Sequence, residues 1–449
     1  MENQVSWKER ISYGLGDTAS NLIFQVITLY LMFYYTDVFG LDVAAVGTLF
    51  LIARIIDALD GPIFGILIDR TNTKWGKSRP WFLWLCIPFA AVAILTFMTP
   101  DFSANGKLIY AYVTYILLGI LYAGINLPLT SLLSSMTSNS HERTVINTVR
   151  MLLAQIGALI VSVGVMPFVA FFGKGNQQAG FQWTMTMFAA IAVVLFLITF
   201  KNTRERVQVN GNKPVPFKEG VKAIKGNTPW WLMLVLGVFM WMAMVGKGTA
   251  LIYFLKYNFG REDLIPVLNG LNILLLVGIA FTPLVSKRLG KRNTLLLGML
   301  IGAVTQVVVF FAEQAISVGL LITANAIGNI GLGLGAGLLF AMLIDTVDYG
   351  EWKSGVRAQG LLTAASSFGV KFGMGIGGAL TAWILSNGGY VPNATQTESS
   401  LNAISFNFIW LPMICFLICS FLLLFYKLDR VEKQMIGDLG AKRSIDIGA

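Results

Sequence analysis

The chain has 449 residues, of which 55% are hydrophobic and 12% charged, and its mean hydropathy is +0.69. A soluble domain needs fewer apolar residues to fill its core, so this composition predicts an integral membrane protein. The net charge of +10 comes from cations in the polar loops, which argues against nucleic-acid binding. The three cysteines lie in apolar runs without disulfide or metal-ligand spacing, so we predict no metal site and no cofactor.

Apolar runs long enough to cross a bilayer as helices, about 17–25 residues, recur along the whole chain. Nothing alternates with a period of two, which excludes a barrel of strands. The pattern predicts an all-α membrane protein with twelve transmembrane helices, at residues 11–36, 43–68, 81–99, 108–135, 146–172, 181–200, 230–255, 264–286, 293–312, 316–346, 359–388 and 403–427.

The distribution of Lys and Arg predicts the orientation. Most of the 33 lie in both termini and in the loops on the same side. The opposite side carries only Lys107, Lys174, Lys256 and Arg261. By the positive-inside rule, both termini are cytoplasmic and the protein is a multi-pass component of the plasma (inner) membrane.

One long polar stretch, Lys201 to Pro229, separates six predicted helices from six. The same offset of 214 residues relates Gly76 to Gly290, Lys77 to Lys291 and Arg143 to Arg357. These features predict two parallel six-helix repeats, the arrangement of major-facilitator transporters. The predicted parts are an N-terminal bundle (1–200), a cytoplasmic linker (201–229), a C-terminal bundle (230–428) and a cytoplasmic tail (429–449).

The loop in "GILIDRTNTKWGKSRP" is basic and follows a helix that ends in an acid. Such charges either latch the two bundles together in one state or simply anchor the loop on the positive side. "GKS" here is no phosphate loop, because the required upstream glycine is replaced by Thr71. "IDTVDYGEWKSGVR" is a second charged helix end, in which a plain salt bridge is the alternative to a gate. The candidate gate residues are Asp69, Arg70, Lys77, Arg143, Asp345, Asp348 and Arg357.

The motifs "ISYGLGD", "YYTDVFGL", "GTLFLIARIIDAL", "DRTNTKWGKSRPW" and "DTVDYGEWKSGVR" resemble those of the glycoside–pentoside–hexuronide:cation symporter family, the melibiose-permease relatives. The resemblance covers the chain from Ser6 to about Leu428. It implies a major-facilitator fold and secondary uptake of a sugar-like solute driven by a cation gradient.

Three charges interrupt the second predicted helix, where an ionisable side chain is a functional candidate because of its cost in lipid. Arg54, Asp57 and Asp60 are spaced i, i+3, i+6 and lie broadly on one face. They form a cation-coupling site or a fixed salt bridge, and Asp60, further from Arg54, is the better proton carrier. Asp57 matches the family position, but the second cation-site aspartate of melibiose permease is replaced by Gly61. We therefore favour protons over sodium.

The sugar-binding aspartates of melibiose permease correspond to Asn21 and Asn126 here, both asparagine as in glucuronide permease. Asparagine donates and accepts hydrogen bonds to hydroxyls, and Tyr122 lies one turn before Asn126. The alternative for the two asparagines is interhelical hydrogen bonding alone.

Further substrate candidates are charged. Arg150 and Lys371 match the family, whereas Lys247 has no counterpart and either snorkels to the interface or faces the cavity. Two lysines at one cavity would bind a carboxylate, which motivates a hexuronide hypothesis. Asp17 serves either substrate or gate.

The predicted function is import of a glycoside, pentoside or hexuronide by cation symport with alternating access. The alternative is a gradient-independent facilitator or exchanger of the same fold. A membrane enzyme is disfavoured because no cluster of His, Cys and Asp is present in the sequence. The expected partners are the sugar, a coupling H⁺ or Na⁺ and membrane lipid, and the protein is expected to be a monomer.

Overall fold

The computed structural model describes residues 5–137, 139–207, 224–356 and 358–429, with the short pieces 431–432, 434–435 and 437–439. Within these ranges the chain is helical and contains no strand, and one isolated bridge joins Thr73 to Gly76. The predicted all-α class is confirmed.

The N-terminal part contains α1 (Trp7–Phe33), η1 (Tyr34–Val38), α2 (Val43–Arg70), α3 (Arg79–Thr96), α4 (Ala104–Met136), α5 (Ser140–Gly173) and α6 (Gln177–Asn202). The later part contains α8 (Thr228–Tyr253), η2 (Phe254–Asn258), η3 (Glu262–Leu264), α9 (Ile265–Gly270), η4 (Leu271–Ile273), α10 (Leu274–Leu289), α11 (Lys291–Gln314), α12 (Val318–Ser354), α13 (Gln359–Asn387), α14 (Glu398–Ser405), η5 (Phe406–Trp410) and α15 (Leu411–Leu424). Each of the twelve predicted segments coincides with one helix or one run of consecutive helices.

Polar residues at the loop ends set where several helices begin. Asp42 accepts a hydrogen bond from the backbone N–H of Ala45 at 2.9 Å, and Asn139 accepts those of His141 and Glu142. These side chains satisfy amide groups that the first helical turn leaves without partners. At the other end, α12 stops at Gly355, whose φ of +73° suits glycine.

Ten helices among the described residues are long and apolar enough to cross a membrane. The helices α1 and α2 are not among them, although both have sufficient length. In α2 the reason is its charged residues, three of which belong to the predicted cation site. Both helices carry predicted functional residues, Asp17 and Asn21 on α1 and the three charged residues on α2.

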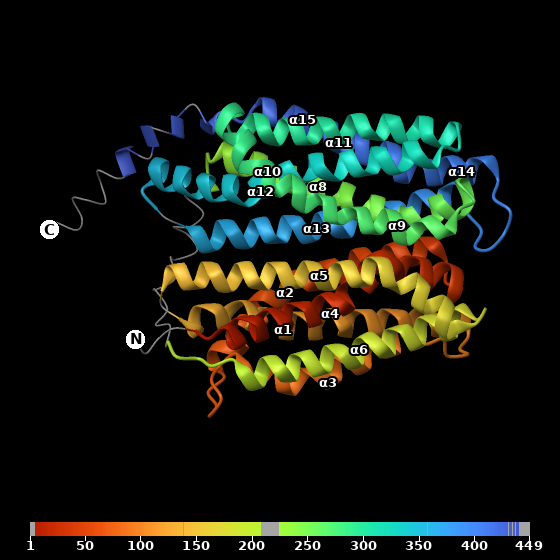
Figure 1. Ribbon diagram of the computed structural model, residues 1–449, viewed down its shortest axis with the longest axis horizontal. Coiled ribbons are helices and arrows are strands. Elements are labelled where there is room, and N and C mark those ends of the chain that lie inside the picture. The colour runs from red at the N-terminus through yellow and green to blue at the C-terminus, as the bar shows by residue number, and fades with distance from the viewer. Residues whose placement is uncertain are drawn as a thin grey trace. The chain divides into compact units, whose positions relative to one another are not determined.

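The chain forms two compact units. Unit 1 comprises Met1–Asn210, Leu251–Gly270 and Gly378–Leu401, and unit 2 comprises Gly211–Ala250, Leu271–Gly377 and Asn402–Ala449. In unit 1, α1 packs against α4, α5 and α6, α4 also contacts α2 and α3, and α5 contacts α9 (Figure 1). In unit 2, α11 and α12 form the most extensive pair, flanked by α10 and α15. The predicted bundle boundaries and linker stay predictions.

Small residues allow close helix contact in unit 2. A Cβ added at Gly298 of α11 would lie 2.5 Å from the carbonyl oxygen of Gly331 in α12, which no side chain tolerates. Helices in lipid gain their packing energy from such close approach, because lipid tails are as apolar as leucine.

Candidate functional site

An ion pair within α2 forms the centre of the site. Arg54 Nη1 lies 2.8 Å from Asp57 Oδ2, and the two side chains are 14% and 15% exposed. The i, i+3 spacing brings them together on one helical face, as the sequence predicted. Arg54 Nη2 also donates to the Tyr115 hydroxyl of α4 at 3.4 Å. Pairing of opposite charges lowers the cost of holding either one inside the membrane.

A cavity of about 30 Å³ opens beside this pair. Four helices line it, with the residues Phe24, Ile27, Ala53, Arg54, Asp57, Phe89, Tyr115, Leu118, Gly119 and Tyr122. The volume suits one water molecule or a small cation rather than a sugar. Among the described lining residues, Asp57 is the one carboxylate.

The glycine in this wall gives Asp57 its space. A Cβ added at Gly119 of α4 would lie 2.8 Å from Asp57 Oδ1. Any side chain at this position would therefore displace the carboxylate from Arg54. Sequence reasoning missed Gly119 and Tyr115, although both lie on α4 one and two turns before the predicted residue Tyr122.

Asp60 occupies a different environment. It is 4% exposed and is not among the described residues that line the cavity. A step of three residues turns an α-helix by about 300°, so Asp60 is offset by about 60° from Asp57 around α2. Its predicted role as a proton carrier stays a prediction.

A second ion pair joins α1 to α5. Asp17 Oδ2 lies 3.4 Å from Arg150 Nε, and both side chains are partly exposed. Asn21 Nδ2 donates to the backbone oxygen of Asp17 at 2.9 Å and to its Oδ1 at 3.3 Å. Asp17 therefore orients two predicted sugar-binding residues, a link that the sequence did not reveal.

The two predicted sugar-binding residues of α4, Tyr122 and Asn126, are joined by a hydrogen bond. Asn126 Nδ2 donates to the Tyr122 hydroxyl at 3.0 Å. The Tyr122 ring stacks on Phe24 of α1, with centroids 4.8 Å apart and an interplanar angle of 19°. One face of the Tyr122 ring is thus already covered. Phe24 was missed, although its position three residues after Asn21 puts it on nearly the same side of α1.

The two lysines of the substrate set lie in unit 2. Lys247 of α8 places its ammonium 5.2 Å from the centroid of the Phe408 ring, a cation–π contact. Lys371 is partly buried in α13. Unit 1 holds the other five predicted substrate residues, Asp17, Asn21, Tyr122, Asn126 and Arg150.

The basic loop between α2 and α3 is held by an acid that sequence reasoning missed. Glu205 accepts hydrogen bonds from the backbone N–H groups of Lys77, Ser78 and Arg79 at 2.9, 2.8 and 3.1 Å. This carboxylate satisfies amides at the start of α3 and is favoured by the positive end of the helix dipole. Asp69 and Arg70 lie exposed at the end of α2.

Two other gate candidates, Arg143 and Asp345, bond within their own units. Arg143 donates to the carbonyl oxygens of Thr137 and Ser134 at 2.8 and 3.1 Å and so caps the end of α4. In unit 2, Lys291 pairs with Asp345 at 2.6 Å and with Glu432 at 2.7 Å.

Asp348 and Arg357 are the last two gate candidates. Asp348 is partly buried on α12. Arg357 lies outside the described residues. All seven gate assignments stay predictions.

The family model described as "MFS/sugar transport protein" matches residues 12–430. The isoprimeverose transporter of Lactiplantibacillus pentosus is 46% identical to this chain, over 99% of the chain and 93% of that protein. The putative glycoside/cation symporter YagG of Escherichia coli (strain K12) is 34% identical, over 96% of the chain and 95% of that protein.

Among solved structures, the inward-facing bacterial homologue of the lysosomal transporter Spinster is similar, with a TM-score of 0.71 at 14% identity, over 96% of this chain and 97% of that one. This likeness confirms the predicted major-facilitator fold. The relatives are transporters, which confirms the predicted class of protein over a membrane enzyme.

Proposed function

Because the chain belongs to the MFS/sugar transport protein family, we propose that this multi-pass membrane protein imports a glycoside in symport with protons, by alternating access. The observation that carries the proposal is the cavity beside the Arg54–Asp57 pair, which reaches Tyr122. Tyr122 in turn bonds Asn126, so that the coupling carboxylate and the sugar-binding groups share one surface of unit 1.

The ligand set favours a proton over sodium. A hard cation such as sodium requires several oxygen ligands. Among the described lining residues, side-chain oxygens come only from Asp57, Tyr115 and Tyr122. A proton needs one carboxylate, and Arg54 beside it provides a partner that competes with the proton for Asp57. Binding and release of the proton at Asp57 would thus change the strength of the ion pair.

The charges of unit 1 favour a glycoside without an acid group. Arg54 is paired with Asp57, and Arg150 is paired with Asp17. Each guanidinium therefore already has a carboxylate partner, and a hexuronide would have to displace one of them. Asn21 and Asn126 provide neutral donors and acceptors for hydroxyls. The relative named an isoprimeverose transporter makes isoprimeverose the first ligand to test.

Coupling follows from the order in which the two ligands act. Protonated Asp57 releases Arg54, and the sugar then binds to the hydroxyl and amide groups next to it. The protein with proton and sugar bound then changes from the outward-open to the inward-open state. Loss of the proton restores the ion pair between Arg54 and Asp57. We include cytoplasmic termini, from the distribution of Lys and Arg, and a monomeric state in the proposal.

The test is a thermal-shift panel on the purified protein in detergent, with isoprimeverose, other neutral glycosides and glucuronides, at two pH values and with or without sodium. A ligand at ten times its dissociation constant stabilises the folded state by about 1.4 kcal/mol. We expect isoprimeverose to stabilise and glucuronides to have no effect. Stabilisation by glucuronides alone would reverse the assignment and favour a site at Lys371 and Lys247.

Uptake into proteoliposomes separates symport from the alternative, a gradient-independent facilitator. We expect an imposed pH gradient to drive accumulation above equilibrium and a sodium gradient to have no effect. Counterflow without gradient-driven accumulation would instead identify a facilitator or exchanger.

A further inference from the structure

A buried acid lies at the end of α1, far along the helix from the site described above. Asp37 belongs to the π-helical turn η1, and its side chain is 0% exposed. A buried carboxylate is tolerated only when other groups pair with it and satisfy its oxygens. The side chains that pair with Asp37 therefore indicate what this buried carboxylate does.

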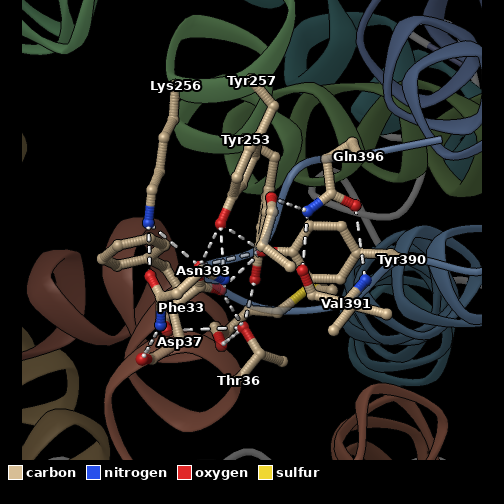
Figure 2. A network of polar contacts seen from close by, with 12 residues as sticks. Phe33, Thr36, Asp37, Tyr253, Lys256, Tyr257, Tyr390, Val391, Asn393 and Gln396 are labelled. Carbon is tan, nitrogen blue, oxygen red and sulfur yellow. Dashed lines mark hydrogen bonds and ion pairs between the residues drawn. The ribbon is translucent and has the colours of Figure 1, made fainter. Parts of the chain in front are cut away.

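Four side chains donate to this carboxylate. Lys256 Nζ and the Tyr257 hydroxyl lie 3.2 and 2.8 Å from Oδ1, and the Tyr390 hydroxyl lies 2.9 Å from both oxygens. The Thr36 hydroxyl lies 2.8 Å from Oδ2. Figure 2 shows these groups converging on Asp37.

A loop residue completes the network. Asn393 Nδ2 donates to the backbone oxygen of Asp37 at 2.7 Å, and its Oδ1 accepts from Lys256 at 2.8 Å (Figure 2). The backbone N–H of Asn393 donates to the Tyr257 hydroxyl at 3.0 Å. With φ of +55°, Asn393 occupies the left-handed region, which asparagine tolerates better than most residues.

The network joins parts of the chain that are remote in sequence. The Asp37 partners at Lys256 and Tyr390 are 219 and 353 residues away. Both partner segments, Leu251–Gly270 and Gly378–Leu401, group with the N-terminal helices in unit 1 although they come from the later part of the chain. These polar contacts therefore tie the end of α1 to η2 and to the loop after α13.

A tightly packed layer lies beside the network within the same unit. A Cβ added at Gly47 of α2 would lie 2.7 Å from the Ala382 Cβ of α13, and one at Gly378 would lie 3.1 Å from the Phe50 ring. The Tyr30 hydroxyl of α1 accepts from Asn269 at 3.0 Å. Small residues and one hydrogen bond thus hold α1 and α2 against the two later segments.

We propose that Asp37, Lys256, Tyr257, Tyr390 and Asn393 form an outer latch, which closes the extracellular end of the transport path and opens to admit the sugar. This inference rests on the proposed function and orientation, in which Lys256 lies on the side that is poor in cations. Asp37 is the centre of the latch because Lys256, Tyr257 and Tyr390 bond to its carboxylate and Asn393 to its backbone oxygen.

Polar chemistry suits a closure that must open repeatedly. When the segments part, water replaces each hydrogen bond, so that the net cost of opening is far below the strength of the bonds. An apolar seal of the same area would expose its whole surface to water instead. Burial, and next the charge of Asp37, raise the pKa of the Tyr390 hydroxyl, which keeps it protonated as a donor.

The latch is tested by the access of a reagent to a cysteine placed on α1 between the latch and the cavity. Cys86, Cys415 and Cys419 are replaced by serine, and Thr28→Cys is introduced as the reporter. Thr28 is partly exposed and lies one helical turn from the cavity residue Phe24, toward the latch. Proteoliposomes are treated from outside with a membrane-impermeant maleimide, without any sugar.

Two variants weaken the latch and one serves as a matched control. Asp37→Asn removes the charge, and Tyr390→Phe removes one donor while it keeps the ring that packs edge-on against Tyr253. Tyr34→Phe makes the same change in the same turn as Asp37, and the Tyr34 hydroxyl bonds to none of the described residues.

We expect Asp37→Asn to raise the labelling rate from outside at least about fivefold and Tyr390→Phe about twofold, because each shifts the population toward the open state. Tyr34→Phe should label like the parent. Equal rates in all variants would overturn the latch, and so would an increase seen only from the inner side.

The result does not depend on which ligand the protein carries. If labelling rises but no glycoside stabilises the protein in the thermal-shift panel, the latch stands and the proposed function fails. If Asp37→Asn does not fold, Tyr390→Phe decides, because it keeps the ion pair between Asp37 and Lys256.

Discussion

Replacement of Gly119 by alanine tests the link between the cavity wall and Asp57, the carboxylate that we propose to carry the proton. The added Cβ would lie 2.8 Å from Asp57 Oδ1, whereas ordinary contact begins at 3.4 Å, so the carboxylate must move by at least about 0.6 Å. A shift of that size would stretch the ion pair with Arg54, which is now 2.8 Å long.

The size of the effect follows from Coulomb's law. Lengthening a pair from 2.8 Å by this amount loses about 1 kcal/mol at an effective dielectric constant of about 20. This loss corresponds to a factor of about five in the balance between the paired and released carboxylate. Alanine is also a better helix former than glycine by about 1 kcal/mol, which offsets the strain. We therefore expect Gly119→Ala to fold normally but to lose coupling.

The assay compares accumulation and counterflow of isoprimeverose in proteoliposomes with an imposed pH gradient. Accumulation by Gly119→Ala should fall about fivefold, while counterflow and thermal unfolding stay as in the parent. Gly237→Ala is the control, since an added Cβ there would meet nothing within 4 Å. Equal accumulation by the two variants would refute the reasoning.

Three further outcomes are expected. Tyr122→Phe removes the hydroxyl that accepts from the Asn126 amide, a loss of about 1 kcal/mol. The dissociation constant of the glycoside should therefore rise about fivefold in titration calorimetry, and an unchanged constant would exclude Tyr122 from the site. Glu205→Ala leaves three backbone N–H groups without their acceptor and should lower the free energy of unfolding in detergent by about 2 kcal/mol, with glycoside binding unchanged. A normal unfolding temperature would show that Glu205 does not hold the loop before α3. Lys247→Met should leave isoprimeverose binding unaltered because the ammonium packs over Phe408, and a loss of binding would place Lys247 in the sugar site.

The helices could be predicted because each apolar run carries its own signal. The Arg54–Asp57 pair was also predictable, since i, i+3 neighbours in a helix lie on the same face whatever surrounds them. Asp60 shares that spacing in the sequence, yet it is buried apart from the described cavity lining. The local pattern shows which residues share a face but not which neighbouring helix covers each part of it.

Contacts between helices could not be predicted from the sequence pattern. The Asp17–Arg150 pair depends on how α1 and α5 are rotated against each other, and Glu205 reaches Lys77 only because the chain turns back after α6. Two partners of Asp37, Lys256 and Tyr390, lie 219 and 353 residues away. Neither hydrophobic periodicity nor charge counts show which helices lie side by side. Asp37 was therefore noticed in the sequence only as part of the family motif "YYTDVFGL".

The polar character of α2 has a consequence for how the protein is made. A single Arg or Asp at the centre of an isolated helix costs about 2.5–3.5 kcal/mol on insertion into a bilayer, and α2 carries Arg54, Asp57 and Asp60. The internal ion pair relieves part of this cost, and the Tyr115 hydroxyl of α4 supplies a further partner. During synthesis α2 therefore emerges before the helix that stabilises it, and we expect it to stay at the translocon until α4 arrives. We therefore expect the charged groups of α2 to set the order in which the first helices enter the membrane.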